Sequence, residues 1–216
     1  MEKEHILTLQ RTDRYRPALS FWFLSILYSI VLMSCTSRNA VIEGVLPNDS
    51  YDNEWVYWVP YQGATSETVD SARVSKNAFR ITISDYNLNK MGFVRLRPLL
   101  RLEMQEIIVY TEVGTTFLRL DSISSASGTP LNVVLQSWKD RKHQYDRDVS
   151  AFYRQLRDED VIDKEDINKA IENAFKDYCN DVFKVVAVNK NNDAGKFIYS
   201  LHKQFFTTEQ INELGL

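Results

Sequence analysis

Cys35 is the residue of this 216-residue chain whose setting points most directly to chemistry. It directly follows Leu32-Met33-Ser34, which ends the uncharged apolar run Ala18–Met33 and gives the Leu-x-small-Cys order of a bacterial lipobox. At such a cysteine the thiol is the nucleophile that takes a diacylglyceryl group, and the chain is then cut just before it. We therefore expect Cys35 to be lipidated and to begin the mature protein.

Residues 1–34 have the layout of a secretory signal peptide. The segment before the apolar run is polar and carries four basic groups, at Lys3, Arg11, Arg14 and Arg16, and a small residue precedes the break. The apolar run is shorter than the ~20 residues of a spanning helix, although an uncleaved anchor and a buried core helix remain alternatives. Two or three acyl chains hold a protein firmly to a membrane, so residues 35–39 are expected to be a lipidated tether.

Other residues that could do chemistry form no catalytic or metal-binding pattern. Cys179 lies on an apolar-periodic stretch, where a lone cysteine is usually a small buried hydrophobe rather than a reactive thiol. His143 is expected to be solvated and His202 partly buried, and neither has a second ligand at zinc-site spacing. The chain also lacks GxSxG. We therefore expect no enzyme activity, no metal and no cofactor.

Four aromatic residues crowd one candidate strand. Trp55 and Tyr57 would share one face of that strand, Trp58 would take the other, and Tyr61 follows. They could stack on sugar rings or on a partner peptide. They could equally fill a core, to which aromatic side chains contribute large buried areas.

Arg95, Arg97 and Arg101 line one side of another short segment. Guanidinium groups can grip a carboxylate or phosphate through two parallel hydrogen bonds. The alternative is a solvated strand edge that charge protects from pairing with other chains.

Amino-acid composition and net charge exclude several classes of protein. With 44% hydrophobic, 12% aromatic and 25% charged residues the chain is globular rather than disordered. A formal net charge of −3 argues against a dedicated nucleic-acid binder. Only 7 Gly leave little material for phosphate-cradling loops.

Residues 40–126 are expected to form an antiparallel β-sandwich or open barrel of about seven strands. Short runs with period-2 alternation alternate with turn residues, and none of the gaps leaves room for a crossover helix. Val74–Ala78 is predicted to be a tight hairpin with Asn77 in the left-handed conformation. The expected strands are Val41–Leu46, Glu54–Pro60, Thr68–Val74, Ala78–Ile83, Gly92–Arg97, Glu106–Glu112 and Thr115–Asp121.

Residues 127–216 are expected to form a helical subdomain after the small-residue linker Ser124–Pro130. Apolar residues recur at spacings of three and four from Leu131 to Leu156, and the run Lys139–Lys142 is assigned to the opposite, charged face. Asp163 could cap a second helix, whose apolar face runs from Ile167 to Val185.

Two further helices are predicted after the break at Asn189–Asp193. A third helix, Ala194–Phe206, would present Phe197, Leu201 and Phe205 to the core. Thr207 and Gln210 form a capping box for a last short helix that ends at Gly215. These apolar faces must be buried, so we expect the helices to pack on the sandwich.

Four sequence blocks carry a family resemblance, which covers about Val41 to Leu214. They are Val69-Asp70-Ser71-Ala72-Arg73-Val74 with Phe79, then Ile107–Gly114, then Ser127–Asn132, and more weakly Asn189, Asn192, Asp193, Ala194 and Gly195. Together the blocks resemble the domain of unknown function found at the N-terminus of many Bacteroidetes lipoproteins, where it precedes a thioredoxin-like domain of the thiol-disulfide interchange or alkyl-hydroperoxide-reductase type.

The residues of these blocks for which a physical role can be given have structural roles. Gly114 suits a turn that needs positive φ, and Ser127 or Thr129 could cap the helix that Pro130 begins. The chain ends at Leu216 and contains no CxxC, so the redox chemistry of the longer relatives does not carry over. The resemblance implies the accessory module alone.

The expected function is therefore that of a membrane-anchored, non-catalytic accessory or binding lipoprotein of the bacterial envelope. A thioredoxin-like envelope protein is a possible partner, and no nucleic acid is expected. The alternative is a carbohydrate- or peptide-binding lipoprotein that uses the Trp55–Tyr61 strand. Acidic residues just after Cys35 would suggest surface export; Thr36-Ser37-Arg38-Asn39 has none, which favours the periplasmic side of the outer membrane.

Overall fold

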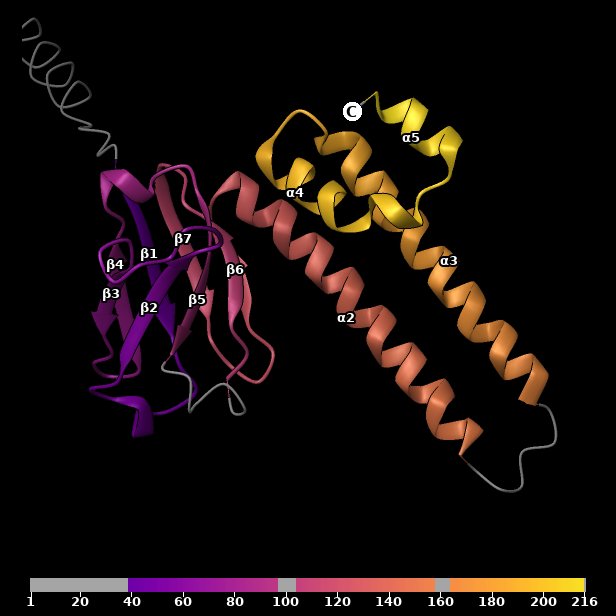
Figure 1. Cartoon of the computed structure of the whole chain (residues 1–216). Helices are drawn as coiled ribbons and strands as arrows, with labels where there is room; N and C mark the ends of the chain where they lie inside the picture. The colour runs from indigo at the N-terminus through magenta and orange to yellow at the C-terminus, as the bar shows by residue number, and fades with distance from the viewer. Residues whose placement is uncertain (1–38, 97–103, 158–163, 216) are drawn as a thin grey trace, which may run out of the picture. The chain divides into compact units, whose positions relative to one another are not determined.

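The computed structural model describes residues 39–96, 104–157 and 164–215 of the chain. A β-rich first part is followed by helices, as the sequence predicted (Figure 1). The strands are β1 (Ala40–Val45), β2 (Trp55–Pro60), β3 (Asp70–Arg73), β4 (Ala78–Thr82), β5 (Met91–Leu96), β6 (Ile107–Tyr110), β7 (Gly114–Arg119) and β8 (Ser125–Ser127). The helices are α2 (Pro130–Leu156), α3 (Lys164–Asn189), α4 (Asp193–His202) and α5 (Thr208–Leu214).

The strands form two four-stranded sheets with the orders β4-β1-β7-β8 and β3-β2-β5-β6. Alternate residues of each strand point into the space between the sheets, as period-2 patterning requires. In β2 these are Val56 and Trp58, and in β4 they are Phe79 and Ile81; all four are buried. The sandwich core therefore comes from the alternation that the sequence shows.

Gly92 makes room for the largest side chain of that core. A Cβ atom built on Gly92 would lie 2.4 Å from the ring of Trp58, which has no exposed surface. Glycine is therefore needed at this point of β5 because the indole lies directly over its backbone.

Two features of the sheets differ from the prediction. β1 pairs in parallel with β7, with Val41 opposite Thr115, and antiparallel with β4 on its other side. Residues 125–127 are not linker but strand β8, which pairs with β7 through Leu118 and Ala126. Both differences depend on pairing between distant segments, which local alternation does not specify.

The predicted hairpin at Val74–Ala78 is confirmed. Lys76 and Asn77 both have positive φ, 53° and 59°, and Ser75 and Ala78 exchange backbone hydrogen bonds. Positive φ at both central residues is the geometry that matches the twist of a two-residue hairpin. The carboxylate of Asp52 accepts hydrogen bonds from the Lys76 and Asn77 N–H groups, each at 3.0 Å.

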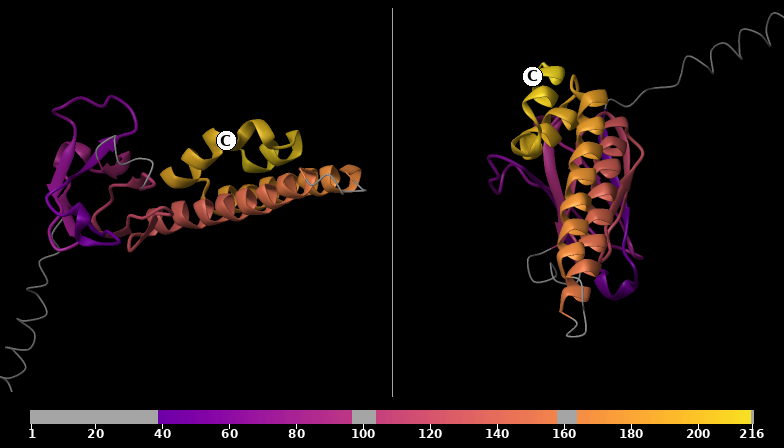
Figure 2. Two further views of the ribbon diagram at one scale, coloured as in Figure 1. Left: turned by 90° about the horizontal axis from the view of Figure 1, so that it is seen from below. Right: turned by 90° about the vertical axis from the view of Figure 1, so that its right-hand side faces the viewer.

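The helical part has its own core, which α2, α3 and α4 share. Tyr178, Val182 and Val186 of α3 are buried in it, together with Leu135 of α2. Figure 2 shows α4 and α5 on one face of the α2–α3 pair. The predicted apolar face of the third helix is confirmed for Phe197, which is partly buried and packs against this core, and is wrong for Leu201 and Phe205, which are exposed. The buried residues of α4 are Ala194, Gly195, Ile198 and His202.

Helix ends follow the predicted chemistry in most cases. The Thr207–Gln210 capping box is present, and Gly215 ends α5 in the left-handed conformation. Pro130 stands in the first turn of α2, but the Thr129 side chain makes no cap hydrogen bond. The carboxylate of Glu112 instead accepts from the Leu131 N–H at 2.7 Å. Asp163, the predicted cap of α3, lies outside the described residues.

A buried polar clamp joins α2 to the sandwich. Asn132, which has no exposed surface, accepts from the Tyr110 N–H and donates to the Tyr110 carbonyl, both at 2.8 Å. Its amide also donates to the hydroxyls of Thr116 and Thr129. The Thr129 hydroxyl is thus used inside this clamp rather than as a helix cap.

Candidate functional site

Trp58 and Tyr61 have structural surroundings. Trp58 is in the sandwich core, on the opposite side of β2 from Trp55 and Tyr57, as predicted. The Tyr61 ring meets Phe197 of α4 edge to face at 5.5 Å and lies 5.9 Å from the Phe93 ring. Tyr61 therefore helps to join the sandwich to the helices, although it is still 45% exposed.

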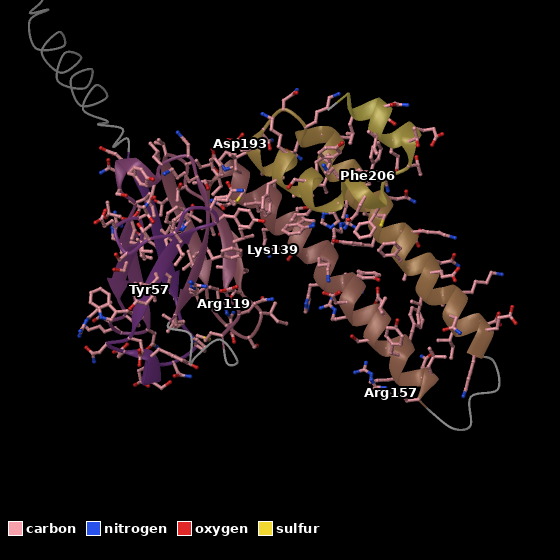
Figure 3. All side chains as sticks on the ribbon, in the orientation of Figure 1. Tyr57, Arg119, Lys139, Arg157, Asp193 and Phe206 are labelled. Atoms are coloured by element: carbon pink, nitrogen blue, oxygen red, sulfur yellow. The ribbon has the colours of Figure 1, made fainter. Side chains whose placement is uncertain are left out.

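Trp55 and Tyr57 lie on the outer face of the β3-β2-β5-β6 sheet. Alternation along β2 turns both rings away from the core; Trp55 is 40% exposed and Tyr57 is half-buried. Their ring centroids are 6.5 Å apart with an interplanar angle of 26°. Figure 3 labels Tyr57 on this face.

The neighbouring strands place arginines beside both rings. Arg73 of β3 is the cross-strand partner of Trp55, and its guanidinium carbon lies 5.0 Å from the centroid of the indole ring. Arg95 of β5 is the cross-strand partner of Tyr57. We refer to Trp55, Tyr57, Arg73 and Arg95 as the aromatic–arginine surface.

The two arginines differ in their electrostatic surroundings. Arg95 forms an ion pair with Glu106 at 3.5 Å, and its side chain is mostly buried. For Arg73, no carboxylate of the described residues lies within ion-pair distance. Arg73 therefore offers its charge and five donors to a ligand, while its cation–π contact holds it over Trp55.

The prediction of an arginine-protected strand edge is wrong for Arg95, because β5 is a central strand between β2 and β6. Arg97 and Arg101 lie outside the described residues. Of the three arginines, only Arg95 is therefore placed at the candidate site. Arg73 joins it through strand pairing, and nothing in its local sequence pointed to Trp55.

The aromatic–arginine surface consists of the residue types that contribute most of the binding energy at protein–protein interfaces. Trp, Tyr and Arg are the residue types enriched at such hot spots, because each covers a large area and keeps a polar group for hydrogen bonding. Trp55 and Tyr57 supply area, and Arg73 supplies charge. The arrangement suits binding of a ligand that carries a carboxylate or another planar acceptor.

Lys139 is the titratable group with the most unusual surroundings. It lies on the same side of α2 as Asn132 and Leu135, at helical spacing, so it faces the sandwich rather than the predicted charged face. Its Nζ is buried without a hydrogen-bond partner among the described residues. Burial lowers the pKa of Lys139 to about 7.

A small cavity of about 150 Å³ lies beside Lys139, between α2 and the segments that flank β6 and β8. Glu106, Asp140, Lys142, His143 and Asp146 supply the titratable groups of its lining. Because Nζ itself is covered, we regard Lys139 as a group that affects stability rather than one that meets a ligand.

His202 and Cys179 belong to the helical core. His202 is buried; its Nδ1–H donates to the Ile198 carbonyl at 3.0 Å, and its Nε2 accepts from the Tyr178 hydroxyl at 2.8 Å. Burial lowers the pKa of His202 and raises the pKa of the free thiol of Cys179. The predicted burial of Cys179 is confirmed, and His143 is half-buried.

Within the described ranges, no helix is long and apolar enough to cross a membrane. The described residues likewise hold no group of three or more His, Cys, Asp or Glu side chains that could bind a metal ion. Cys35 and the apolar run before it lie outside the described residues.

Comparisons of the chain with models of protein families, with curated proteins and with solved structures found no match.

Proposed function

We propose that this chain is a lipid-anchored, non-catalytic binding protein of the bacterial cell envelope. In this proposal acyl chains on Cys35 hold it to the outer membrane, facing the periplasm, and the aromatic–arginine surface contacts its partner. The signal-peptide layout of residues 1–34 and the lipobox order at Cys35 support the anchor.

One observation carries the binding role: Trp55 and Tyr57 are held side by side on an outward sheet face with Arg73 over the indole. A core would have used these rings for packing, as it uses Trp58. The combination favours an envelope protein as partner, with a thioredoxin-like protein as the candidate that the sequence resemblance suggests. A carbohydrate is the alternative ligand, because sugar rings can pack against aromatic side chains.

The anchor is tested by labelling cells that express the full chain with radioactive palmitate. We expect label on the wild-type protein and none on Cys35→Ser. An unlabelled wild-type protein with an intact Met1 end would contradict the anchor and leave the binding surface to be judged separately.

The binding surface is tested by placing a photo-crosslinking amino acid at Tyr57 in the native host. Val188 of α3 provides the control position, since it is an apolar residue that is 86% exposed and lies outside the aromatic–arginine surface. We expect a discrete envelope protein to crosslink at position 57 only, and the adduct to disappear with Arg73→Glu. Equal crosslinking at both positions would contradict a specific surface.

Electrophoresis of the protein through gels that contain soluble polysaccharides distinguishes a carbohydrate ligand from a protein partner. Retardation that the double variant Trp55→Ala/Tyr57→Ala abolishes, without a protein adduct at position 57, would favour a glycan ligand. Migration unaffected by every polysaccharide, with an adduct present, would favour the protein partner.

A further inference from the structure

The helical part has a groove between α2 and α3 that the proposed function does not use. Its volume is about 610 Å³, and residues of both helices line it. On the side of the helix pair that carries α4, Trp138, which does not line the groove, contacts Phe197 and His202. Figure 2 shows α4 and α5 on one side of the pair.

The helix pair is longer than the helix that covers it. α2 has 27 residues and α3 has 26, whereas α4 has 10. At 1.5 Å per residue the pair extends over roughly 40 Å and α4 over about 15 Å. Two packed helices bury only one side of each other. Much of the α2–α3 pair is therefore not covered by a further helix.

The apolar lining of the groove combines small and aromatic side chains. It consists of Ala151 of α2 and Ala170 and Ala174 of α3, together with Tyr145, Phe152 and Tyr178. Small residues allow another helix to approach closely, and a helix that lays its apolar side in such a groove is a recurrent mode of recognition. The shape therefore suits a helix with a narrow apolar stripe.

The rim is acidic on both sides. Asp148 of α2 and Asp177 of α3 are exposed, and no Lys, Arg or His of the described residues forms an ion pair with either carboxylate. At one end Asp181 is already neutralised by Arg141 at 2.9 Å and Lys184 at 3.0 Å. The charges left for a partner are therefore two carboxylates, one on each flank.

We propose that this groove binds an amphipathic helix of another protein, with a narrow apolar stripe and Lys or Arg on both flanks. Basic flanks would meet Asp148 and Asp177 while the stripe covers the apolar lining. A second copy of this chain is the poorer occupant, because symmetric pairing of two such faces brings acidic rims together. This surface is separate from the aromatic–arginine surface.

The test measures binding of two labelled helical peptides to the full chain by fluorescence anisotropy. Each peptide is roughly 20 residues long, which spans about 30 Å as a helix, and carries the same Ala/Leu stripe; one has Lys on its flanks and the other Glu. At low salt we expect the Lys peptide to bind at least about tenfold more tightly than the Glu peptide. Its binding should weaken as added salt screens the carboxylates of the rim.

Two sets of variants make the result specific. Asp148→Lys/Asp177→Lys should reverse the preference between the peptides, whereas Glu165→Lys/Glu172→Lys, at exposed positions of α3 outside the groove, should not. Ala174→Leu, which places a larger side chain in the groove, should weaken the binding of both peptides. Circular dichroism checks that each variant is folded.

Equal affinity for the two peptides, or a preference that Asp148→Lys/Asp177→Lys leaves unchanged, would overturn the proposal. A wild-type dimer in solution that Ala174→Leu dissociates would also overturn it, because the occupant would then be a second copy.

Discussion

Asn132 shows how one buried side chain can hold two parts of a fold together. Its amide satisfies both backbone groups of Tyr110 and contacts two threonine hydroxyls, all in the interior. A buried polar group left without its partner costs about 1–3 kcal/mol. Removing Asn132 would leave several such groups unpaired at once.

We therefore predict that Asn132→Ala lowers the free energy of unfolding by about 2–4 kcal/mol, because the Tyr110 N–H and carbonyl lose their partners without gaining water. Urea denaturation measures the change. Gln144→Ala, which removes an exposed hydrogen bond to Asp148, should stay within about 0.5 kcal/mol of wild type. Comparable effects of the two variants would contradict the role of the clamp.

Lys139 makes stability depend on pH. Its pKa is about 7 in the folded chain, against 10.5 as the ordinary value for an exposed lysine. Between these two values the unfolded chain holds a proton that the folded chain lacks, so stability rises with pH across this window. Below pH 7 the folded chain carries the full cost of a buried ammonium.

Lys139→Met is therefore predicted to raise the melting temperature, most at pH 6 and progressively less as the pH approaches 10. Methionine fills similar space without a charge to desolvate. Thermal denaturation at several pH values checks this, with Lys184→Met as control because the Lys184 side chain is 73% exposed. A gain that does not change with pH would mean that Lys139 keeps its proton throughout.

At the scale of the elements, Gly195 determines how closely α4 can follow α3. A Cβ atom at Gly195 would lie 2.0 Å from the backbone oxygen of Asn189. Asn192 caps α4 in the same turn, and its side chain accepts from the Gly195 N–H at 2.9 Å. The tight connection thus needs a residue without a side chain at this position.

Gly195→Ala should accordingly destabilise the chain by more than about 2 kcal/mol, even though alanine is the better helix former. The clash is with backbone, which cannot rotate away as a side chain can. Ser200→Ala, on the exposed side of α4, is the matched control and should change little. An unchanged or raised melting temperature for Gly195→Ala would show that the α3–α4 turn can open at low cost.

The error in the predicted face of the third helix also belongs to this scale. Leu201 and Phe205 are large and apolar at helical spacing, yet both are exposed. The core takes Ala194, Ile198 and His202, with Phe197 partly buried against it. A close approach between helices selects small residues, and the Tyr178 hydroxyl gives the buried imidazole a partner. Hydropathy alone favours the bulkier side chains.

At the scale of the whole molecule, the described residues belong to one compact unit. The Asn132 clamp, the hydrogen bond from the Tyr110 hydroxyl to Asp193 at 2.5 Å, and the Tyr61–Phe197 ring contact all join the sandwich to the helices. Two parts of a fold that are joined by a buried polar network tend to unfold together.

We predict that the sandwich and the helices unfold in a single transition. Trp fluorescence, which includes Trp58 of the sandwich, and far-ultraviolet circular dichroism, dominated by the helices, should give the same urea midpoint. Asn132→Ala should shift both midpoints equally. Two separated transitions would mean that the junction contributes little to stability.

Much of the architecture could be predicted from local sequence. The seven expected strands, the Lys76–Asn77 turn, the capping box at Thr207 and the change to helices near residue 130 depend on neighbours a few residues apart. Of the candidate site, the shared face of Trp55 and Tyr57 followed from alternation, since successive side chains of a strand point to opposite faces.

The order and kind of the elements follow from local sequence, because periodicity and turn chemistry act over short distances. The faces that are covered depend on tertiary packing, which pairs β1 with β7, places Arg73 over Trp55, buries Trp58 over Gly92 and turns Lys139 toward the sandwich. The physical reason is that burial depends on which distant segment packs against a face, and no local pattern encodes that partner.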